Sequence, residues 1–123
     1  MTRQKVFEYA KKRYGTNPEY LWMKSPEYAV LRHTDNTKWY AVVMKVSKSQ
    51  LGLPGGDEMV DIIDVKCDPY EADFLKKKPG FLPGYHMNHV NWLTVLLDDT
   101  LPDEQILDLL DSSFKLTGTK KPN

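Results

Sequence analysis

Residues 39–46 of the 123-residue chain read Trp-Tyr-Ala-Val-Val-Met-Lys-Val, a nearly continuous apolar run of strand-forming residues. A strand with apolar side chains on both faces is typical of the middle of a sheet, so this segment predicts a central strand. A second β-rich segment, 28–33, precedes it across the polar residues Thr-Asp-Asn-Thr at 34–37. Two such segments flanking turn-forming residues predict a β-hairpin.

The rest of the sheet and its helices lie on either side of this hairpin in the chain. Alternation of apolar residues predicts two further strands, at 60–67 and 92–97. Helical spacing of apolar residues, together with capping residues, predicts three helices, near 3–14, 69–78 and 102–116. The segment between the first helix and the hairpin is too aromatic at 16–22 to be a free loop, so we expect it to fold back on the core. Helices at the ends of a mostly antiparallel sheet predict a two-layer α+β fold.

Length and composition bound the class of protein. A chain of this length predicts one domain, 1–123, because no repeat, low-complexity tract or linker divides it. Hydrophobic residues make up 41% and charged residues 28%, which is ordinary for a globular protein. The single cysteine, Cys67, has no internal partner for a disulfide, and no secretory leader or membrane-length apolar run is evident. We therefore expect a soluble protein of the reducing cytoplasm, without a membrane partner.

Charge is unevenly distributed along the chain. Residues 1–50 carry ten Lys or Arg against four Asp or Glu, whereas the net charge of the whole chain is zero. One reading is a dipolar molecule whose basic side meets an anionic partner. The other is that the charges interleave in space once the chain folds, since half of a sequence is not a face of a fold. The sequence leaves both readings open.

Several sequence blocks resemble one family in residue type and in order along the chain. The most specific is Pro-Gly-Tyr-His-Met-Asn at 83–88, followed by Trp92 and by Leu-Pro-Asp-Glu at 101–104. Together with blocks at 14–22, 38–41 and 66–69, these residues resemble the MmcQ/YjbR-like proteins. The resemblance implies a frataxin-like (CyaY-like) fold, with a sheet and helices packed on one of its faces. It also implies a DNA-binding label, which rests on a fold-level likeness to a double-wing nucleic-acid motif. It brings no set of catalytic residues.

Candidate catalytic and metal-binding residues are few. His86 and His89 lie in a loop opened by Pro83-Gly84, and with one cysteine they lack the paired ligand spacing of a zinc site. A nucleophilic pair of Cys67 and His86 is disfavoured because a cysteine at a strand end is usually a small buried hydrophobe. The chain holds no nucleophile elbow, phosphate-binding loop or dinucleotide fingerprint. We expect no cofactor, no metal and no enzymatic activity.

Two binding functions fit these residues. Cations and exposed aromatic rings suit a nucleic acid, with Trp22, Trp39, Tyr85 and Trp92 as possible stacking surfaces. The rival is a module that binds a protein or a small ligand through the loop 79–92, whose two Pro-Gly pairs fix turns before a dense polar and aromatic run. The predicted nucleic-acid or ligand-binding residues are Lys11, Lys12, Arg13, Lys66, Tyr85, His86, Asn88 and Trp92.

Overall fold

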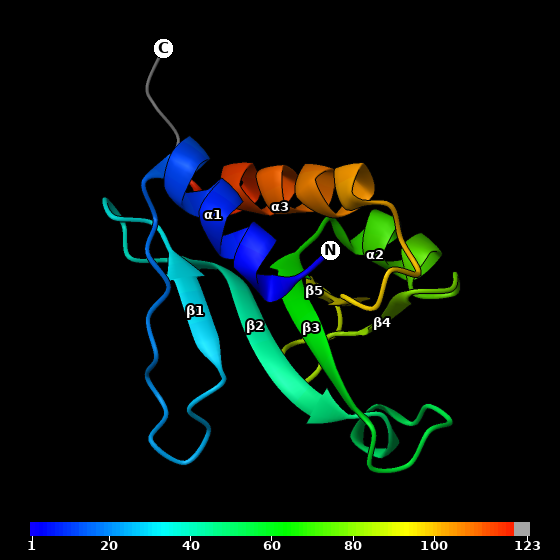
Figure 1. Cartoon of the computed structure of the whole chain (residues 1–123). Coiled ribbons are helices and arrows are strands. Elements are labelled where there is room, and N and C mark those ends of the chain that lie inside the picture. The colour runs from blue at the N-terminus through cyan, green and yellow to red at the C-terminus, as the bar shows by residue number, and fades with distance from the viewer. Residues whose placement is uncertain (120–123) are drawn as a thin grey trace.

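The computed structural model describes residues 1–119 and has a five-stranded sheet beneath a layer of helices (Figure 1). Every pair of neighbouring strands is antiparallel, in the order β1-β2-β3-β5-β4. The predicted α+β fold, with a mostly antiparallel sheet and helices on one face, is confirmed. Within the described residues, the strands are β1 (Ala29–Arg32), β2 (Trp39–Ser47), β3 (Met59–Lys66), β4 (Phe81–Pro83) and β5 (Trp92–Leu96).

The helices are α1 (Arg3–Tyr14), α2 (Pro69–Leu75) and α3 (Asp103–Thr117), with a short 3₁₀ turn, η1 (Ser49–Leu51), at the far end of the β2–β3 hairpin. Capping side chains start two of them: Thr2 Oγ1 accepts from the Lys5 N–H at 3.2 Å, and Asp68 Oδ1 accepts from the Tyr70 N–H at 3.0 Å. Three predicted helix boundaries differ slightly: α2 ends at Leu75 rather than 78, and α3 begins and ends one residue later than 102–116.

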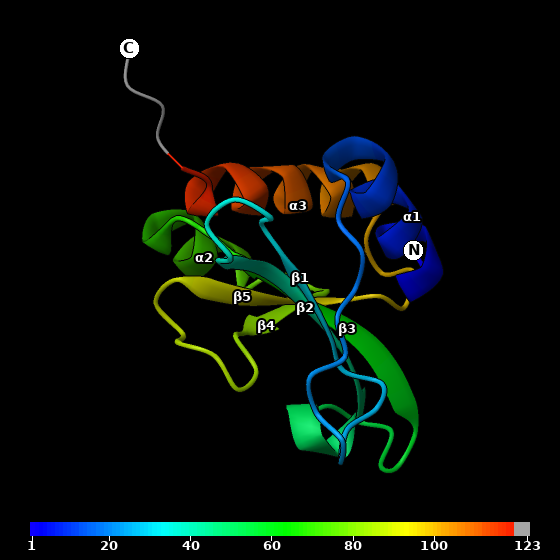
Figure 2. The same ribbon diagram turned by 90° about the vertical axis from the view of Figure 1, so that its left-hand side faces the viewer.

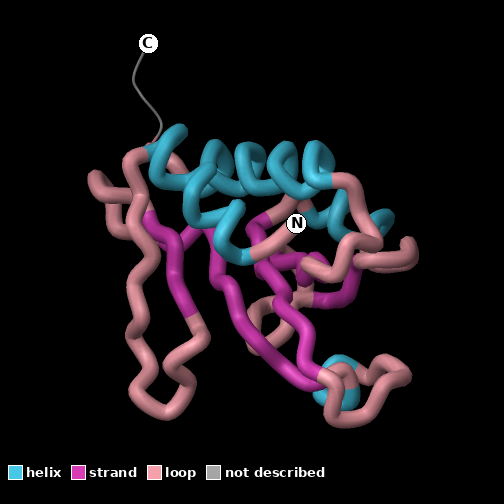
Figure 3. The backbone as a smooth tube through the Cα atoms, in the orientation of Figure 1, coloured by secondary structure: helices cyan, strands magenta, loops and turns pink. Residues whose placement is uncertain are grey.

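The sheet has one face covered by helices and one without them. On the helix-covered face, α1, α2 and α3 pack on strand residues that include Leu31, Val43, Ile63 and Val95. Figure 3 shows the three helices grouped on one side of the strands. The helix-free face carries a second buried cluster, covered by loop and strand side chains instead. Its buried members are Val30, Val42, Met44, Val46, Val60, Ile62 and Leu96. Figure 2 shows the same arrangement from the side, with α3 above the strands.

A bulge in β2 places Tyr40 on the same face as its neighbour Ala41 and so moves Trp39 to the other face. Leu31 pairs with Ala41 but Arg32 pairs with Trp39, so Tyr40 is an extra residue opposite β1. Tyr40 packs in the helix-covered core, while Trp39 packs on the helix-free cluster. The hydroxyl of Ser113 on α3 fills the resulting gap, donating to the Tyr40 carbonyl at 2.5 Å and accepting the Lys66 N–H at 2.8 Å. The bulge therefore places an indole on the face that no helix covers.

Two elements were missed from the sequence. Strand β4 has three residues and ends in Pro83, too short for a periodicity signal. Glu19 forms an isolated bridge with Val30, donating at 3.0 Å and accepting at 2.8 Å, so residues before the hairpin cover part of the outer edge of β1. The expectation that the aromatic segment folds back on the core is met only at this bridge, because the Tyr20, Leu21 and Trp22 side chains stay exposed. None of the helices among residues 1–119 has the length and apolar character needed to cross a membrane.

Candidate functional site

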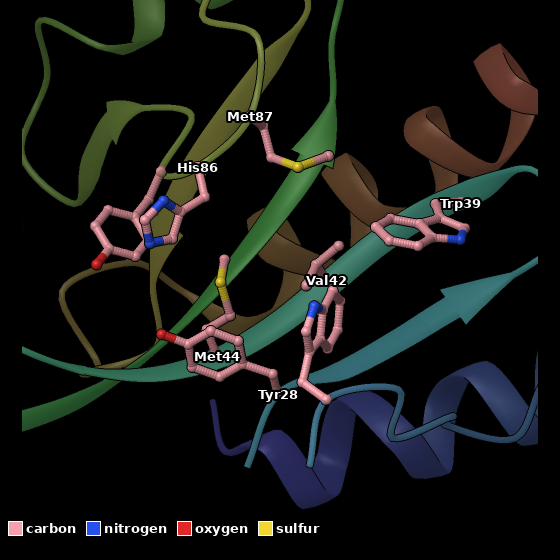
Figure 4. Close-up of a pocket in the computed structure, with 8 residues that line it drawn as sticks. Tyr28, Trp39, Val42, Met44, His86 and Met87 are labelled. Carbon is pink, nitrogen blue, oxygen red and sulfur yellow. The ribbon is translucent and has the colours of Figure 1, made fainter. Parts of the chain in front are cut away.

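A hollow of about 360 Å³ opens on the helix-free face, and we call it the aromatic pocket (Figure 4). Three separate parts of the chain supply its walls: the segment before β1, strand β2 and the loop between β4 and β5. Its size lies within the range of small-ligand pockets, and its lining is mainly aromatic and apolar, as such sites usually are. The lining residues are Trp22, Tyr28, Trp39, Val42, Met44, Tyr85, His86 and Met87.

The first wall comes from the chain between the Glu19 bridge and β1. The Arg32 guanidinium holds the Glu19 carboxylate with two hydrogen bonds of 2.6 Å, which fixes the start of this segment against the strand. A tight turn then brings Tyr28 back, since its N–H donates to the Ser25 carbonyl at 3.0 Å. The Trp22 ring ends up edge-on to the Tyr28 ring, with centroids 6.0 Å apart.

Trp22 also meets the indole that the bulge displaced. Its centroid lies 5.8 Å from that of Trp39, with an interplanar angle of 80°. Trp22, Tyr28 and Trp39 therefore form a corner of steeply inclined rings, as favoured by aromatic quadrupoles. This corner joins residues from two segments that are separated by the whole of β1.

The opposite wall is the loop between β4 and β5, which is held close to the sheet. A Cβ added at Gly84 would lie 2.9 Å from both Trp92 Cβ and the Trp92 carbonyl oxygen, so only glycine fits there. The Tyr85 N–H donates to Thr94 Oγ1 at 2.8 Å. His86 has a left-handed backbone, φ 60°, and its ring lies 4.0 Å from that of Tyr85. These contacts turn Tyr85, His86 and Met87 toward the hollow, as Figure 4 shows for the labelled side chains.

A buried carboxylate lies beside the pocket floor. Asp64 has no solvent-exposed surface, and its Oδ1 accepts from the Thr94 hydroxyl at 2.6 Å. Within residues 1–119, its Oδ2 has no hydrogen-bond partner. Burial raises the pKa of Asp64 to about 7, although the hydrogen bond from Thr94 opposes that shift. A buried ionisable group with an open oxygen is a frequent feature of functional sites.

Asp64 is connected to the pocket from two sides. Its cross-strand partner on β2 is Val42, a lining residue, and such partners lie about 5 Å apart between Cα atoms. On the other side, the Thr94 hydroxyl that donates to Asp64 accepts the N–H of Tyr85, a second lining residue. A change at Asp64 is therefore transmitted to the pocket through one strand neighbour and one hydrogen-bond chain.

The structure divides the eight predicted site residues between the two sides of the sheet. Lys11, Lys12 and Arg13 form the exposed last turn of α1, on the helix-covered side, and Arg13 pairs with Asp111 of α3 at 3.2 Å. The other five belong to the helix-free side or its loop. Tyr85 and His86 line the aromatic pocket, whereas the remaining three do not: Lys66, Asn88 and Trp92.

Those three residues have other surroundings. The Asn88 side chain is used within its own loop, because Oδ1 accepts from the Val90 N–H at 2.7 Å. Lys66 and Trp92 are cross-strand partners at the ends of β3 and β5. The predicted cationic and aromatic groups are thus not one continuous surface.

The helix-covered side uses its own polar groups to tie α1 to α3. The Asp111 carboxylate accepts from the hydroxyls of Tyr9 and Tyr14 and from Arg13 Nε. Burial alone would raise the pKa of Asp111, but these hydrogen bonds and the Arg13 charge hold it below its ordinary value. This cluster joins α1 to α3 through hydrogen bonds that satisfy the Asp111 carboxylate.

The residues considered for catalysis or metal binding are also separated. Cys67 packs in the helix-covered core, and His86 lies across the sheet from it. Burial, aided by the nearby Glu71 and Asp68 carboxylates, raises the pKa of the Cys67 thiol to about 11. His89 lies in a different hollow, beside Tyr70 and Lys76. Among residues 1–119, no group of three or more His, Cys, Asp or Glu side chains is arranged to hold a metal ion.

Sequence reasoning missed most of the pocket. Trp22 and Trp39 were considered as stacking residues but were not among the predicted site residues, and Tyr28, Met44 and Met87 were not considered for it. Asp64 carried a detectable signal, because it is an acidic residue between Ile63 and Val65 inside a predicted strand. An acidic residue in such a place requires either exposure to solvent or hydrogen-bond partners. Among the described residues, only one of the two carboxylate oxygens of Asp64 has a partner.

Comparison with known proteins places the chain in a family. A family model described as YjbR matches residues 11–116. A Bacillus subtilis (strain 168) protein named "Uncharacterized protein YyaQ" is 44% identical over 117 residues, which is 95% of this chain and 98% of that protein. An Escherichia coli (strain K12) protein named "Uncharacterized protein YjbR" is 32% identical over 78 residues, or 63% of this chain and 66% of that protein.

Solved structures agree with the fold. A crystal structure of a Pseudomonas syringae protein has a TM-score of 0.92 and 47% sequence identity, covering 96% of this chain and 100% of that one. A crystal structure of a Deinococcus radiodurans protein has a TM-score of 0.71 and covers 94% of this chain and 77% of that one. At 22% identity, this second likeness is evidence of the shared fold alone.

Proposed function

The chain belongs to the YjbR family, and we propose that it is a small-ligand-binding protein whose site is the aromatic pocket of the helix-free face. The observation that carries the proposal is the convergence of aromatic side chains from three segments on one hollow of about 360 Å³. Aromatic rings provide large contact areas with little loss of side-chain freedom. The loop 79–92, predicted from the sequence as the binding element, contributes one wall.

The polar groups of the lining suit the orientation of a ligand. Tyr28 and Tyr85 carry hydroxyls, and Trp22 and Trp39 carry indole N–H groups. A few polar groups set in an apolar wall fix how a ligand sits, while burial of its apolar surface supplies most of the affinity. The proposed ligand is therefore a compact, largely apolar molecule.

We propose binding without a chemical step. The one thiol of the described chain, that of Cys67, is buried on the opposite side of the sheet, and its raised pKa keeps it protonated near neutral pH. No nucleophile–base pair reaches the pocket from the residues that line it, because neither Ser, Thr nor Cys is among them.

DNA binding is the alternative proposal, and it rests on the exposed Lys11 and Lys12 at the end of α1. The aromatic pocket is separated from these cations by the sheet, so a single strand stacked on Tyr85 would be remote from them. The neutral net charge of the chain also differs from the basic balance of most dedicated nucleic-acid-binding domains. We therefore favour the small ligand.

The three tryptophans provide a built-in test by NMR. Trp22 and Trp39 line the pocket and Trp92 does not. In a fragment screen on isotope-labelled protein, bound fragments should shift the indole N–H signals of Trp22 and Trp39 and leave that of Trp92 almost unchanged. Tyr28→Ala should weaken the hits, while Tyr70→Ala, a change on the exposed surface of α2, should not.

Other patterns of shift would contradict the proposal. A screen with no saturable shift at Trp22 or Trp39 would refute the pocket as a binding site. An oligonucleotide titration at low salt separates the alternative, because DNA binding predicts saturable shifts at the end of α1 that weaken as salt rises.

A further inference from the structure

The lining of the aromatic pocket has a clear charge preference. None of its eight residues is Lys or Arg, and His86 is the one basic side chain among them, so an anionic ligand would meet no permanently charged cation in the wall. The nearest predicted cation on this face, Lys66, lies at the end of β3 and does not line the pocket. The wall chemistry therefore favours a neutral or a cationic ligand over an anionic one.

The ring faces add an attraction for positive charge. Trp22, Tyr28 and Trp39 form a corner of inclined rings, at 75° and 80° to one another. The face of each ring carries partial negative charge, which attracts a cation held within about 6 Å of the centroid. The thioethers of Met44 and Met87 complete the wall with polarisable sulfur atoms.

Asp64 supplies the opposite charge. Its carboxylate is fully buried, its Oδ2 is without a partner among the described residues, and it is the neighbour of Val42 beneath the pocket. A buried carboxylate with one open oxygen is costly to ionise unless positive charge approaches it. A cation in the pocket would provide that compensation.

We propose that the aromatic pocket binds an organic cation bearing a tertiary or quaternary ammonium group, with Asp64, the cross-strand neighbour of the lining residue Val42, as the counter-charge beside the pocket. The inference rests on the proposed function and specifies its ligand class. A quaternary ammonium group has no N–H donors, so it needs no acceptors in the wall and is matched by ring faces and thioethers. A primary ammonium group would instead require partners for three donors, and the only side-chain acceptors in the lining are the Tyr28 and Tyr85 hydroxyls and the His86 imidazole, which would all have to converge on one nitrogen.

The test compares two ligands of the same shape. Choline carries a trimethylammonium group, and its neutral isostere carries a tert-butyl group in the same position. Titration of each ligand, followed at the Trp22 and Trp39 indole signals with Trp92 as the internal reference, gives the two dissociation constants. The wild-type protein should bind choline about tenfold more tightly than the isostere, which is the size expected of a partly desolvated cation–π contact.

Two variants locate the preference. Asp64→Asn removes the counter-charge and keeps the shape, so the ratio of the two affinities, choline over isostere, should fall several-fold. Trp39→Leu keeps an apolar wall and removes a ring face, so it should also reduce the preference. The comparison of choline with its isostere is made on the wild-type protein. It therefore decides the question even where a substitution impairs folding.

The outcomes distinguish this inference from the proposed function. Equal binding of choline and isostere, or tighter binding of the isostere, refutes the cationic ligand and leaves the pocket as a site for neutral molecules. Fragment hits in the pocket with no choline binding up to high millimolar concentration refute it as well. Failure of every fragment to reach Trp22 and Trp39 refutes the proposed function, and the cation inference with it.

Discussion

The two faces of the sheet have similar strand residues but are covered by different elements. On the helix-covered face, three helices close the core. The partly buried carboxylate of Asp111 accepts hydrogen bonds from Tyr9, Arg13 and Tyr14. On the helix-free face, loops and aromatic rings cover the strands, leaving a hollow and a carboxylate, Asp64, with one oxygen unpaired among the described residues.

The difference indicates which face is optimised for stability. Among residues 1–119, the helix-covered face has an unpaired buried group too, the Tyr40 hydroxyl, but this group is neutral and costs less to bury than a carboxylate. Retention of an incompletely paired acid and an unfilled hollow on one face is expected where a site binds something, because natural sequences depart from consistent packing mainly at functional positions.

The largest effect is expected when one core side chain is removed from each face. Ile63→Ala, in the fully buried helix-covered core, should reduce the free energy of unfolding by about 4–5 kcal/mol, the upper part of the range for such truncations. Met44→Ala, on the pocket wall, should cost about 2 kcal/mol, because part of its surface already faces the hollow and loses fewer contacts. Urea denaturation measures both, and equal costs would show that the faces are packed alike.

The second prediction concerns the charge of Asp64. Its pKa is raised to about 7 in the folded protein from an ordinary value of 3.8, so the folded state holds a proton that the unfolded state releases. The resulting stabilisation is complete below pH about 4 and is lost as pH rises to about 8. About three pH units at 1.36 kcal/mol each set an upper bound of about 4 kcal/mol on that loss.

Asp64→Asn isolates this effect, because every other titrating group is common to both proteins. Unfolding free energies of the two proteins should diverge between pH about 4 and about 8, with the variant gaining on the wild type as pH rises. The Thr94 hydroxyl, which donates to the Asp64 carboxylate, is present in both proteins. Parallel pH profiles would mean that Asp64 is ionised at little cost, and that the helix-free face has no poorly compensated charge.

The third prediction tests how firmly the pocket wall is anchored. Gly84→Ala places a Cβ 2.9 Å from Trp92 Cβ and from the Trp92 carbonyl oxygen, which forces the loop away from β5. The expected loss of stability is about 1–3 kcal/mol, the usual cost of overpacking. The Tyr85 N–H should lose its bond to Thr94, so amide exchange at Tyr85 should accelerate while exchange at Ile63 on the other face should not. Unchanged exchange at Tyr85 would show that the loop tolerates the displacement.

The sequence predicted the architecture well because periodicity reports how a strand or helix is buried. The run 39–46 contains the central strand, and capping at Thr2 and Asp68 marks two helix starts where the structure has them. Strand β4 was not predicted because three residues ending in Pro83 are too few to show an alternation of apolar and polar side chains. The bulge at Tyr40 was not predicted because it depends on the register with β1, and the local sequence of β2 does not reveal that register.

The candidate site was predicted only in part for a related reason. Tyr85 and His86 were found because they lie in a dense, turn-rich loop, but Trp22, Tyr28 and Trp39 join them only through tertiary packing. Lys11 and Tyr85 were grouped by residue type, but the sheet separates them. The sequence of a helix does not reveal on which side of a sheet it packs. Pairing at Asp64 likewise depends on Thr94, thirty residues away along the chain.

The last prediction has the smallest expected effect on stability. His86 has φ 60°, a left-handed conformation that costs a non-glycine residue about 1–2 kcal/mol. His86→Gly should relieve this strain, and the greater freedom of glycine in the unfolded chain should offset about 0.5–1 kcal/mol of the gain. The net result is a variant more stable than wild type by up to about 1 kcal/mol in thermal or urea unfolding.

The same substitution should weaken ligand binding, because it removes the ring that lies 4.0 Å from Tyr85 in the pocket wall. Thr37→Gly is the matched control, since Thr37 also has φ 60° but lies in the β1–β2 turn, outside the aromatic pocket. It should leave fragment binding at Trp22 and Trp39 unchanged, with a comparable relief of backbone strain. A stabilised His86→Gly protein with reduced binding would show that the helix-free face retains strain for its site; unaltered binding would assign His86 to the fold of the loop alone, and the pocket would then depend on Tyr85 and the corner of Trp22, Tyr28 and Trp39.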